Sequence, residues 1–138
     1  MTFQTTVIVR YAETERMGIA HHSIYPIWLE EARTQWMAST GMPYSKMEKA
    51  GVMLPLTGLT CRYLGSCTYE DVLTIVVRIL SMSAARISFD YEILKDVQTI
   101  TKAITYHAWI DAKTFRPISL KKRYPYIYQM LETLKDEE

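Results

Sequence analysis

The fold is decided by the stretch Arg10-Tyr-Ala-Glu-Thr-Glu-Arg-Met-Gly-Ile-Ala-His-His-Ser-Ile-Tyr25, which runs from a strand-like start through a turn into a helix. It places two carboxylates, Glu13 and Glu15, and the pair His21-His22 just ahead of the helix N-terminus. A carboxylate can serve as a nucleophile or as a general base. The free backbone N–H groups of a helix start can hold a developing oxyanion. Both halves of an acyl-transfer site therefore lie in one short segment.

The helix that follows is expected to cover residues about 23–40. Ser23 suits the N-cap, Pro26 is tolerated in the first turn, and Gly41 marks the end. The apolar stripe of this helix comprises Ile24, Ile27, Trp28, Ala32 and Trp36. A stripe of this kind predicts one long helix that faces the core.

The other predicted elements lie on both sides of this helix. Residues 3–12 are expected to form a strand, and residues 44–50 a short second helix. After Gly51 the apolar period changes from 3.6 to 2, which is typical of strands. The predicted strands are 53–65, 71–82, 85–95 and 100–112, with a terminal helix at 124–134. One long helix followed by antiparallel strands predicts an α+β fold.

The clearest strand runs from Arg86 to Lys95. Its apolar residues should face one side of the sheet and its polar residues the other, because side chains alternate along a strand. The expected inner residues are Ile87, Phe89, Tyr91 and Ile93, and the expected outer ones are Arg86, Ser88, Asp90 and Glu92.

The opening stretch also resembles the signature of hotdog-fold acyl-CoA thioesterases of the hydroxybenzoyl-CoA thioesterase type. That signature reads roughly Arg-Tyr-x-Glu-Thr-Asp-x-x-Gly-x-x-x-His-x-x-Tyr, followed by a helix with Glu-x-x-Arg. The residues that fit are Arg10, Tyr11, Glu13, Thr14, Gly18, His22, Tyr25, Glu30 and Arg33. Glu15 departs from the pattern, because the family usually has a catalytic Asp there. Less specific matches extend the resemblance over nearly the whole chain: Leu54-Pro55, Tyr63, Tyr69-Glu70-Asp71, Tyr91-Glu92-Ile93 and Lys102-Ala103 through Pro117-Ile118.

The resemblance implies a hotdog fold, in which an antiparallel sheet of about five strands wraps around one long central helix. Hotdog proteins pair edge to edge into dimers, and many dimers associate further. A single helix cannot cover such a sheet and its edges, and exposed edges usually need pairing. We therefore expect a homo-oligomer, a dimer or more specifically a homotetramer.

The bulk composition narrows the class of protein. A chain of 138 residues is expected to be one domain, spanning 1–138, with a sizeable core. Its net charge of +1 gives no electrostatic case for nucleic acid or an anionic membrane. Neither a signal peptide nor a membrane-spanning run is visible. Cys61 and Cys67 are too few for a disulfide framework, so reduced thiols and a cytoplasmic location are expected.

Glu15 is the first catalytic candidate. By the resemblance it would attack the thioester carbonyl or activate a water, and the alternative is a surface glutamate neutralised by Arg16. Its extra methylene relative to Asp matters, because a shift of about 1 Å can cost about 100-fold in rate. Glu13 is the competing carboxylate, for which we favour a structural role beside Arg10 or Arg33. Glu31, together with Glu30, is the fallback on the helix.

His22 is the second catalytic candidate. The resemblance puts its backbone N–H against the thioester oxygen, while a local hydrogen bond of its side chain is an equal alternative. Gly18 is expected to supply a positive φ or a close backbone approach. Tyr25 is expected to line the core or the acyl pocket.

Arg86 is the candidate for CoA phosphates, because the resemblance places basic residues at this strand near the protomer boundary. A solvated surface arginine is almost as good an explanation. A second basic cluster, Lys121-Lys122-Arg123, could likewise either bind CoA phosphates or be a solvated surface run. No glycine-rich phosphate loop is present. No metal site is expected, because adjacent His21 and His22 cannot easily converge on one ion with His107.

The sequence therefore predicts an acyl-CoA thioesterase that hydrolyses a thioester to a carboxylic acid and free CoA. It needs no cofactor, because CoA is part of the substrate. The alternatives are an acyl carrier protein thioesterase and a non-catalytic acyl-CoA-binding hotdog protein. The acyl chain cannot be read from the sequence.

Overall fold

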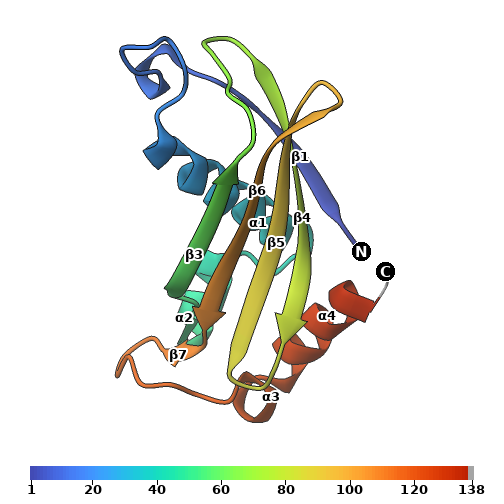
Figure 1. Ribbon diagram of the computed structural model, residues 1–138. Helices are drawn as coiled ribbons and strands as arrows, with labels where there is room; N and C mark the ends of the chain where they lie inside the picture. Colours follow the sequence, from blue (N-terminus) through green and yellow to red (C-terminus); the bar gives the residue numbers. More distant parts are fainter. Residues whose placement is uncertain (137–138) are drawn as a thin grey trace.

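The structure is a computed structural model that describes residues 1–136. Its main feature is a five-stranded antiparallel sheet that wraps around helix α1 (Tyr25–Ser39) (Figure 1). The strands in spatial order are β1 (Phe3–Ile8), β4 (Val72–Met82), β5 (Arg86–Lys95), β6 (Gln98–Ala108) and β3 (Leu56–Tyr63). The predicted α+β hotdog arrangement is therefore confirmed.

The smaller elements lie before α1 and around the ends of the sheet. Short 3-10 turns form at η1 (Tyr11–Glu13) and η2 (His22–Ile24), ahead of α1. The remaining elements are α2 (Tyr44–Ala50), β2 (Val52–Met53), β7 (Ile110–Asp111), α3 (Leu120–Arg123) and α4 (Pro125–Asp136). The second helix is confirmed as predicted, and the terminal helix divides into α3 and α4.

Helix α1 buries a regular stripe against the sheet. The buried residues follow the 3.6-residue period and are Tyr25, Trp28, Leu29, Ala32, Arg33, Trp36 and Met37. The prediction was wrong for Ile27, which is 53% exposed, because the stripe begins at Tyr25 and not at Ile24. Each large apolar side chain buried here contributes about 1.5–3 kcal/mol.

The inner face of the sheet meets this stripe. On β5, Ile87, Phe89, Tyr91 and Ile93 are all buried, as their alternation predicts. Phe89 stands edge-on to Trp36 of α1, with a distance of 6.4 Å between the ring centroids. Phe3 of β1 stacks on the same Trp36 ring at 6.1 Å. Ser88 is buried on the outer face, where its hydroxyl pairs with that of Ser81 at 2.6 Å.

The predicted strand 100–112 is divided into β6 and β7, because β7 leaves the large sheet to pair with β2. Three other predicted boundaries change, each for a local reason. Strand β1 ends at Ile8 because residues 10–13 form a turn, in which the backbone N–H of Arg10 donates to the Glu13 carboxylate. Ser23 is not the N-cap, because the His21 imidazole accepts the Ser23 N–H instead. The predicted strand 53–65 is interrupted at Leu54-Pro55, so that β2 pairs with β7 and only β3 joins the large sheet.

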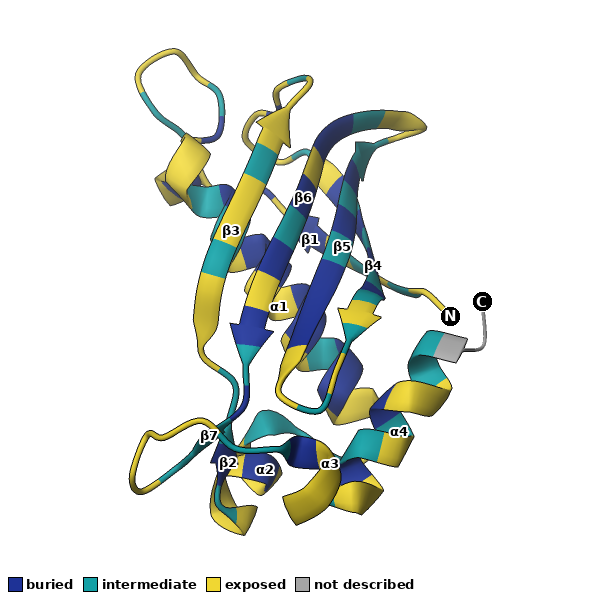
Figure 2. Cartoon of the chain, turned by 60° about the horizontal axis from the view of Figure 1, so that its bottom comes forward, coloured by how far each residue is buried: buried dark blue, intermediate teal, exposed yellow. Residues whose placement is uncertain are grey.

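One edge of the sheet is left open. Strand β3 pairs with β6 on one side and with no other strand of residues 1–136 on the other. Figure 2 shows that most of β3 is exposed. Its exposed apolar and aromatic side chains include Leu56, Leu59 and Tyr63. An apolar open edge is a surface that proteins normally cover. Within residues 1–136, every helix is too short or too polar to cross a membrane.

We predict that Gly51→Ala destabilises the fold more than Gly41→Ala. Both glycines have left-handed backbones, with φ of +108° and +83°, so each substitution meets a backbone cost of about 1–2 kcal/mol. At Gly51 the new Cβ would also lie 2.8 Å from the Tyr124 hydroxyl oxygen, whereas Gly41 has open space. Urea denaturation measures both free energies of unfolding. Equal losses for the two variants would contradict the close packing of Tyr124 on Gly51.

Candidate active site

The segment between β1 and α1 is held by the buried carboxylate of Glu13, which is 4% exposed. Its Oε1 accepts the backbone N–H of Arg10 at 2.7 Å, and its Oε2 accepts the indole N–H of Trp28 at 3.2 Å. The Arg10 guanidinium lies 3.4 Å from Oε2. The Glu13 carbonyl accepts the N–H of His21 at 2.9 Å. Glu13 therefore has the expected structural role beside Arg10 and not beside Arg33.

Glu15 sits at the start of a tight turn. Its carbonyl accepts the N–H of Gly18 at 2.8 Å, and its side-chain Oε1 accepts the N–H of Met17 at 2.6 Å. Gly18 has φ of +84° with open space where a Cβ would be, so the backbone conformation and not close packing requires glycine. Arg16, the expected partner of Glu15, forms no ion pair with it in residues 1–136.

The start of the helix leaves one backbone donor available. His21 accepts the Ser23 N–H through its side chain and the Ile24 N–H through its carbonyl. The N–H of His22 has no acceptor among residues 1–136. The His22 carbonyl accepts the Tyr63 hydroxyl at 3.1 Å, and its exposed ring stacks on that of His21. A free amide in this position is a donor that a ligand oxygen can reach.

A cavity of about 400 Å³ brings these groups together. Its walls come from the Glu15 turn, the start of α1, the end of β3 and the following loop. The lining residues are Glu15, Met17, Ile19, Ala20, His21, His22, Tyr25, Tyr63, Gly65 and Ser66. We call this space the Glu15 cavity. It combines a carboxylate, a free amide and mainly apolar or aromatic walls.

Tyr25 forms the inner wall of this cavity. Its ring stands edge-on to Tyr63 at a centroid distance of 4.9 Å, and its hydroxyl lies 3.6 Å from the Cys67 sulfur. Burial, helped by the contact with Cys67, raises the pKa of Tyr25 well above its ordinary value. The phenol therefore stays protonated at neutral pH, which suits a wall and not a base.

Arg86 lies at the other end of the sheet. Arg86 pairs with Ala108 of β6. Tyr63, beside the cavity, pairs with Thr101 of β6, and Thr101 pairs on its other side with Ile93 of β5. The seven residue steps from Ile93 to Arg86 span roughly 24 Å along β5. Arg86 is exposed, but within one chain it does not reach the Glu15 cavity.

The helix carboxylates and the third histidine also lie away from the Glu15 cavity. Glu31 accepts a hydrogen bond from the Gln35 side chain, and Glu30 lines a second cavity with Arg33. His107 is buried, with its Nε2 2.9 Å from Thr105 Oγ1, and does not approach His21 or His22. Burial lowers the pKa of His107 to about 4, so its ring is neutral.

Tyr63 is the site residue that local sequence reasoning did not identify. Its hydroxyl meets His22 from 41 positions away, through the pairing of β3 with β6. No periodic pattern carries this contact. Its only signal was its place among the weaker matches of the family resemblance.

The sequence was compared with models of known protein families. A model described as the Thioesterase-like superfamily matches residues 9–128. The chain belongs to this superfamily. The predicted resemblance to hotdog-fold thioesterases is thereby confirmed.

Individual members of the superfamily support this assignment. The crystal structure of a DHNA-CoA thioesterase from Staphylococcus aureus is 30% identical, with a TM-score of 0.91, and covers 96% of this chain and 89% of its own. A Bacillus subtilis protein named as a proposed acyl-CoA thioesterase, YneP, is 32% identical over 118 residues, 85% of this chain and 86% of its own. The chloroplastic acyl-acyl carrier protein thioesterase ATL3 of Arabidopsis thaliana is 28% identical over 114 residues, 81% of this chain and 60% of its own.

We predict that Glu13→Gln lowers the free energy of unfolding by about 1–3 kcal/mol. The amide keeps the shape of the side chain, but its NH₂ would face donors on Arg10 and Trp28. Glu15→Gln is the matched control, because half-exposed Glu15 bonds only its own turn and should change stability by at most about 0.5 kcal/mol. Thermal and urea unfolding measure both. Equal stability of the two variants would refute the role of Glu13.

Proposed function

We propose that the protein is an acyl-CoA thioesterase, which uses water to split a thioester into a carboxylic acid and free CoA. One observation carries the proposal: Glu15 and His22 line the same cavity, and the His22 N–H has no acceptor among residues 1–136. Membership of the Thioesterase-like superfamily supports the reaction class. The names of the relatives support a CoA thioester as substrate.

The two polar groups have complementary roles in this reaction. The thioester carbonyl oxygen would accept the His22 N–H, which then stabilises the negative charge that develops when the carbonyl is attacked. Helix α1 begins at Tyr25, directly after the η2 turn that His22 opens, and its N-terminal dipole adds to this effect. Glu15 would either attack the carbonyl directly or remove a proton from an attacking water. No metal or redox cofactor is needed for either route.

The walls of the cavity suit an acyl group and its pantetheine thioester. Met17, Ile19 and Tyr25 offer apolar surface, and Gly18 lets the turn close so that Glu15 can face this space. The Met17 N–H fixes the Glu15 carboxylate as an acceptor.

The charge distribution favours acyl carrier protein as a second candidate substrate. The end of the molecule formed by α2, the β4–β5 hairpin and the β7–α3 segment is held together by backbone hydrogen bonds, including Leu120 N–H to Ala84 O. Residues 44–51, 83–86 and 111–123 carry only two acidic residues, Glu48 and Asp111. They carry eight basic ones: Lys46, Lys49, Arg86, Lys113, Arg116, Lys121, Lys122 and Arg123. Such a basic end complements an acidic carrier protein.

We further propose that two copies pair through β3 and that such dimers associate into a tetramer. A two-fold axis that joins identical edge strands makes them antiparallel. The Tyr63 end of one β3 then meets the Leu56 end of its partner. Because Leu56 lies opposite His107, beside Ile87 and Arg86, this pairing brings the partner's Arg86 toward the Glu15 cavity. Sedimentation as a monomer at micromolar concentration would exclude this assembly.

The free thiols of Cys61 and Cys67 are consistent with a reducing compartment such as the cytoplasm.

We predict that Glu15→Gln abolishes most hydrolysis and leaves fold and assembly intact. The amide cannot act as a base or as a nucleophile, and loss of a general base typically costs roughly 100- to 10,000-fold. Release of free thiol from a panel of acyl-CoA and acyl carrier protein substrates measures the rate. The same panel separates the two substrate classes, and wild-type protein without activity on any member would favour the non-catalytic binding protein.

Glu15→Asp is the companion variant, because it restores the residue usual in the family. If the turn has adjusted to the longer side chain, Asp will be slower than Glu; if Glu15 weakens the site, Asp will be faster. Near wild-type hydrolysis by Glu15→Gln would disprove the assignment of Glu15. Glu13 and Glu31 would then be the next carboxylates to test.

We predict that Arg86→Ala raises KM for acyl-CoA and leaves kcat unchanged. A phosphate contact made equally in ground and transition states contributes to binding and not to turnover. Lys102→Ala, which removes an exposed cation from the middle of β6, is the control. A fall in kcat at constant KM would give Arg86 another role.

A further inference from the structure

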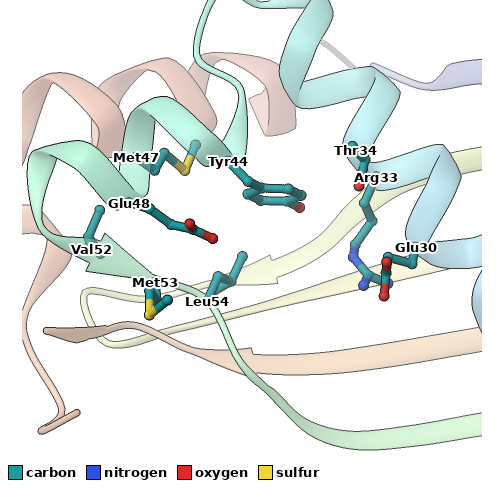
Figure 3. A pocket seen from close by; sticks show the side chains of 9 residues that line it. All are labelled: Glu30, Arg33, Thr34, Tyr44, Met47, Glu48, Val52, Met53 and Leu54. Carbon is teal, nitrogen blue, oxygen red and sulfur yellow. The ribbon is translucent and has the colours of Figure 1, made fainter. Parts of the chain in front are cut away.

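A second cavity, of about 210 Å³, lies between α1, α2 and β2 (Figure 3). The side chains of Arg33 and Tyr44 enter it from the two helices, while Met47, Val52 and Leu54 contribute apolar surface. We call it the Arg33 cavity. None of its lining residues lines the Glu15 cavity, and the proposed hydrolysis does not use it.

Arg33 is a buried cation whose described partners are all neutral. It is 9% exposed, and its Nη1 donates to the Tyr91 hydroxyl at 2.9 Å. That hydroxyl lies 2.6 Å from Thr105 Oγ1, which continues the polar chain to His107. Within residues 1–136 no carboxylate lies within ion-pair distance of the guanidinium. A buried charge without a counter-charge is costly.

Tyr44 adds a second unmatched group. Its hydroxyl is buried near Arg33, but forms no hydrogen bond of regular geometry with any group of residues 1–136. Burial raises the pKa of Tyr44 to about 12, so the phenol is protonated and can donate at neutral pH. Buried polar groups of native proteins are almost always paired. A cation without a counter-charge and a hydroxyl without an acceptor among residues 1–136 therefore face one cavity.

We propose that the Arg33 cavity binds a small carboxylate. The carboxylate would accept an N–H of Arg33 and the O–H of Tyr44, and its carbon part would lie against Met47, Val52 and Leu54. A cavity of about 150 Å³ holds a benzene ring, so this one accommodates an acid as large as benzoate. The ligand could be the acid that the proposed hydrolysis releases or a free carboxylate from another reaction, and the chemistry of recognition is the same.

The competing occupant is a carboxylate of the protein itself. Glu30, one turn before Arg33 on α1, and Glu48 on α2 both line the cavity, but both are solvent-exposed. Solvent screens an exposed carboxylate more than a buried one, so a ligand that enters the cavity can pair with Arg33 more strongly. If Glu30 instead closed onto Arg33, it would exclude a ligand.

Titration calorimetry of the full chain with benzoate tests the proposal, with uncharged benzamide as the matched ligand. We expect benzoate to bind at least tenfold more tightly than benzamide. Tyr44→Phe removes a hydroxyl that forms no hydrogen bond of regular geometry, so it should keep its stability and weaken benzoate binding about tenfold. Tyr126→Phe, on the exposed surface of α4, is the control and should leave binding unchanged. Arg33→Gln should abolish binding, with circular dichroism to establish that it folds.

Two further variants identify the site. Glu15→Gln should bind benzoate as wild type does, because the Glu15 cavity is separate, and Glu30→Gln should bind it more tightly. Failure of benzoate to bind, equal binding of benzoate and benzamide, or unchanged binding in Tyr44→Phe would overturn the proposal. These readouts need no turnover, so they fail independently of the proposed hydrolysis. If the acid released by hydrolysis is the natural ligand, that acid will also inhibit wild-type hydrolysis more strongly than hydrolysis by Tyr44→Phe. If the acid inhibits both proteins equally while benzoate still binds the wild type, the natural ligand is another carboxylate.

Discussion

The buried carboxylate of Glu13 is the contact on which the candidate site depends. It joins the chain that leaves β1 to Trp28 on α1, while its backbone carbonyl holds His21 at the start of the helix. The Glu15 turn is closed between these two anchor points. Removing such a charge-assisted contact leaves buried donors unsatisfied, which costs more than the hydrogen bonds contribute. The geometry of Glu15 relative to the His22 amide is therefore set by a residue that lines neither wall of the Glu15 cavity.

The local part of this arrangement could be predicted from sequence because its contacts are short in sequence. Glu13 bonds Arg10, Glu15 bonds Met17, and His21 caps Ser23, all within three residues. The choice of N-cap was still wrong, because His21 takes a role for which Ser23 is the commoner residue type. The alternation of buried and exposed residues on β5 and the position of the central helix could also be predicted, because a strand repeats every 2 residues and a helix every 3.6.

The contacts that could not be predicted cross between elements. Tyr63 reaches His22 only because β3 lies at the edge of the sheet, next to the start of α1. From the sequence, Arg33 is the last residue of a Glu-x-x-Arg motif on the predicted helix and a possible partner of Glu13. It is instead buried on the inner stripe of α1, where it meets Tyr91 of β5, 58 positions away. No helical period distinguishes a charged residue on the buried face from one at its margin.

The hydrogen bond from Tyr63 to the His22 carbonyl has a consequence for the dynamics of the molecule. Tyr63 is the last residue of an edge strand that is held by β6 on one side only among residues 1–136. Edge strands and chain segments with few buried contacts open locally at lower free energy than the core. Fraying of β3 would remove one wall of the Glu15 cavity while the stripe of α1 stays packed. In a chain whose β3 is not covered by a second copy, catalytic competence is thus expected to melt as a local unit, at a lower temperature than the domain as a whole.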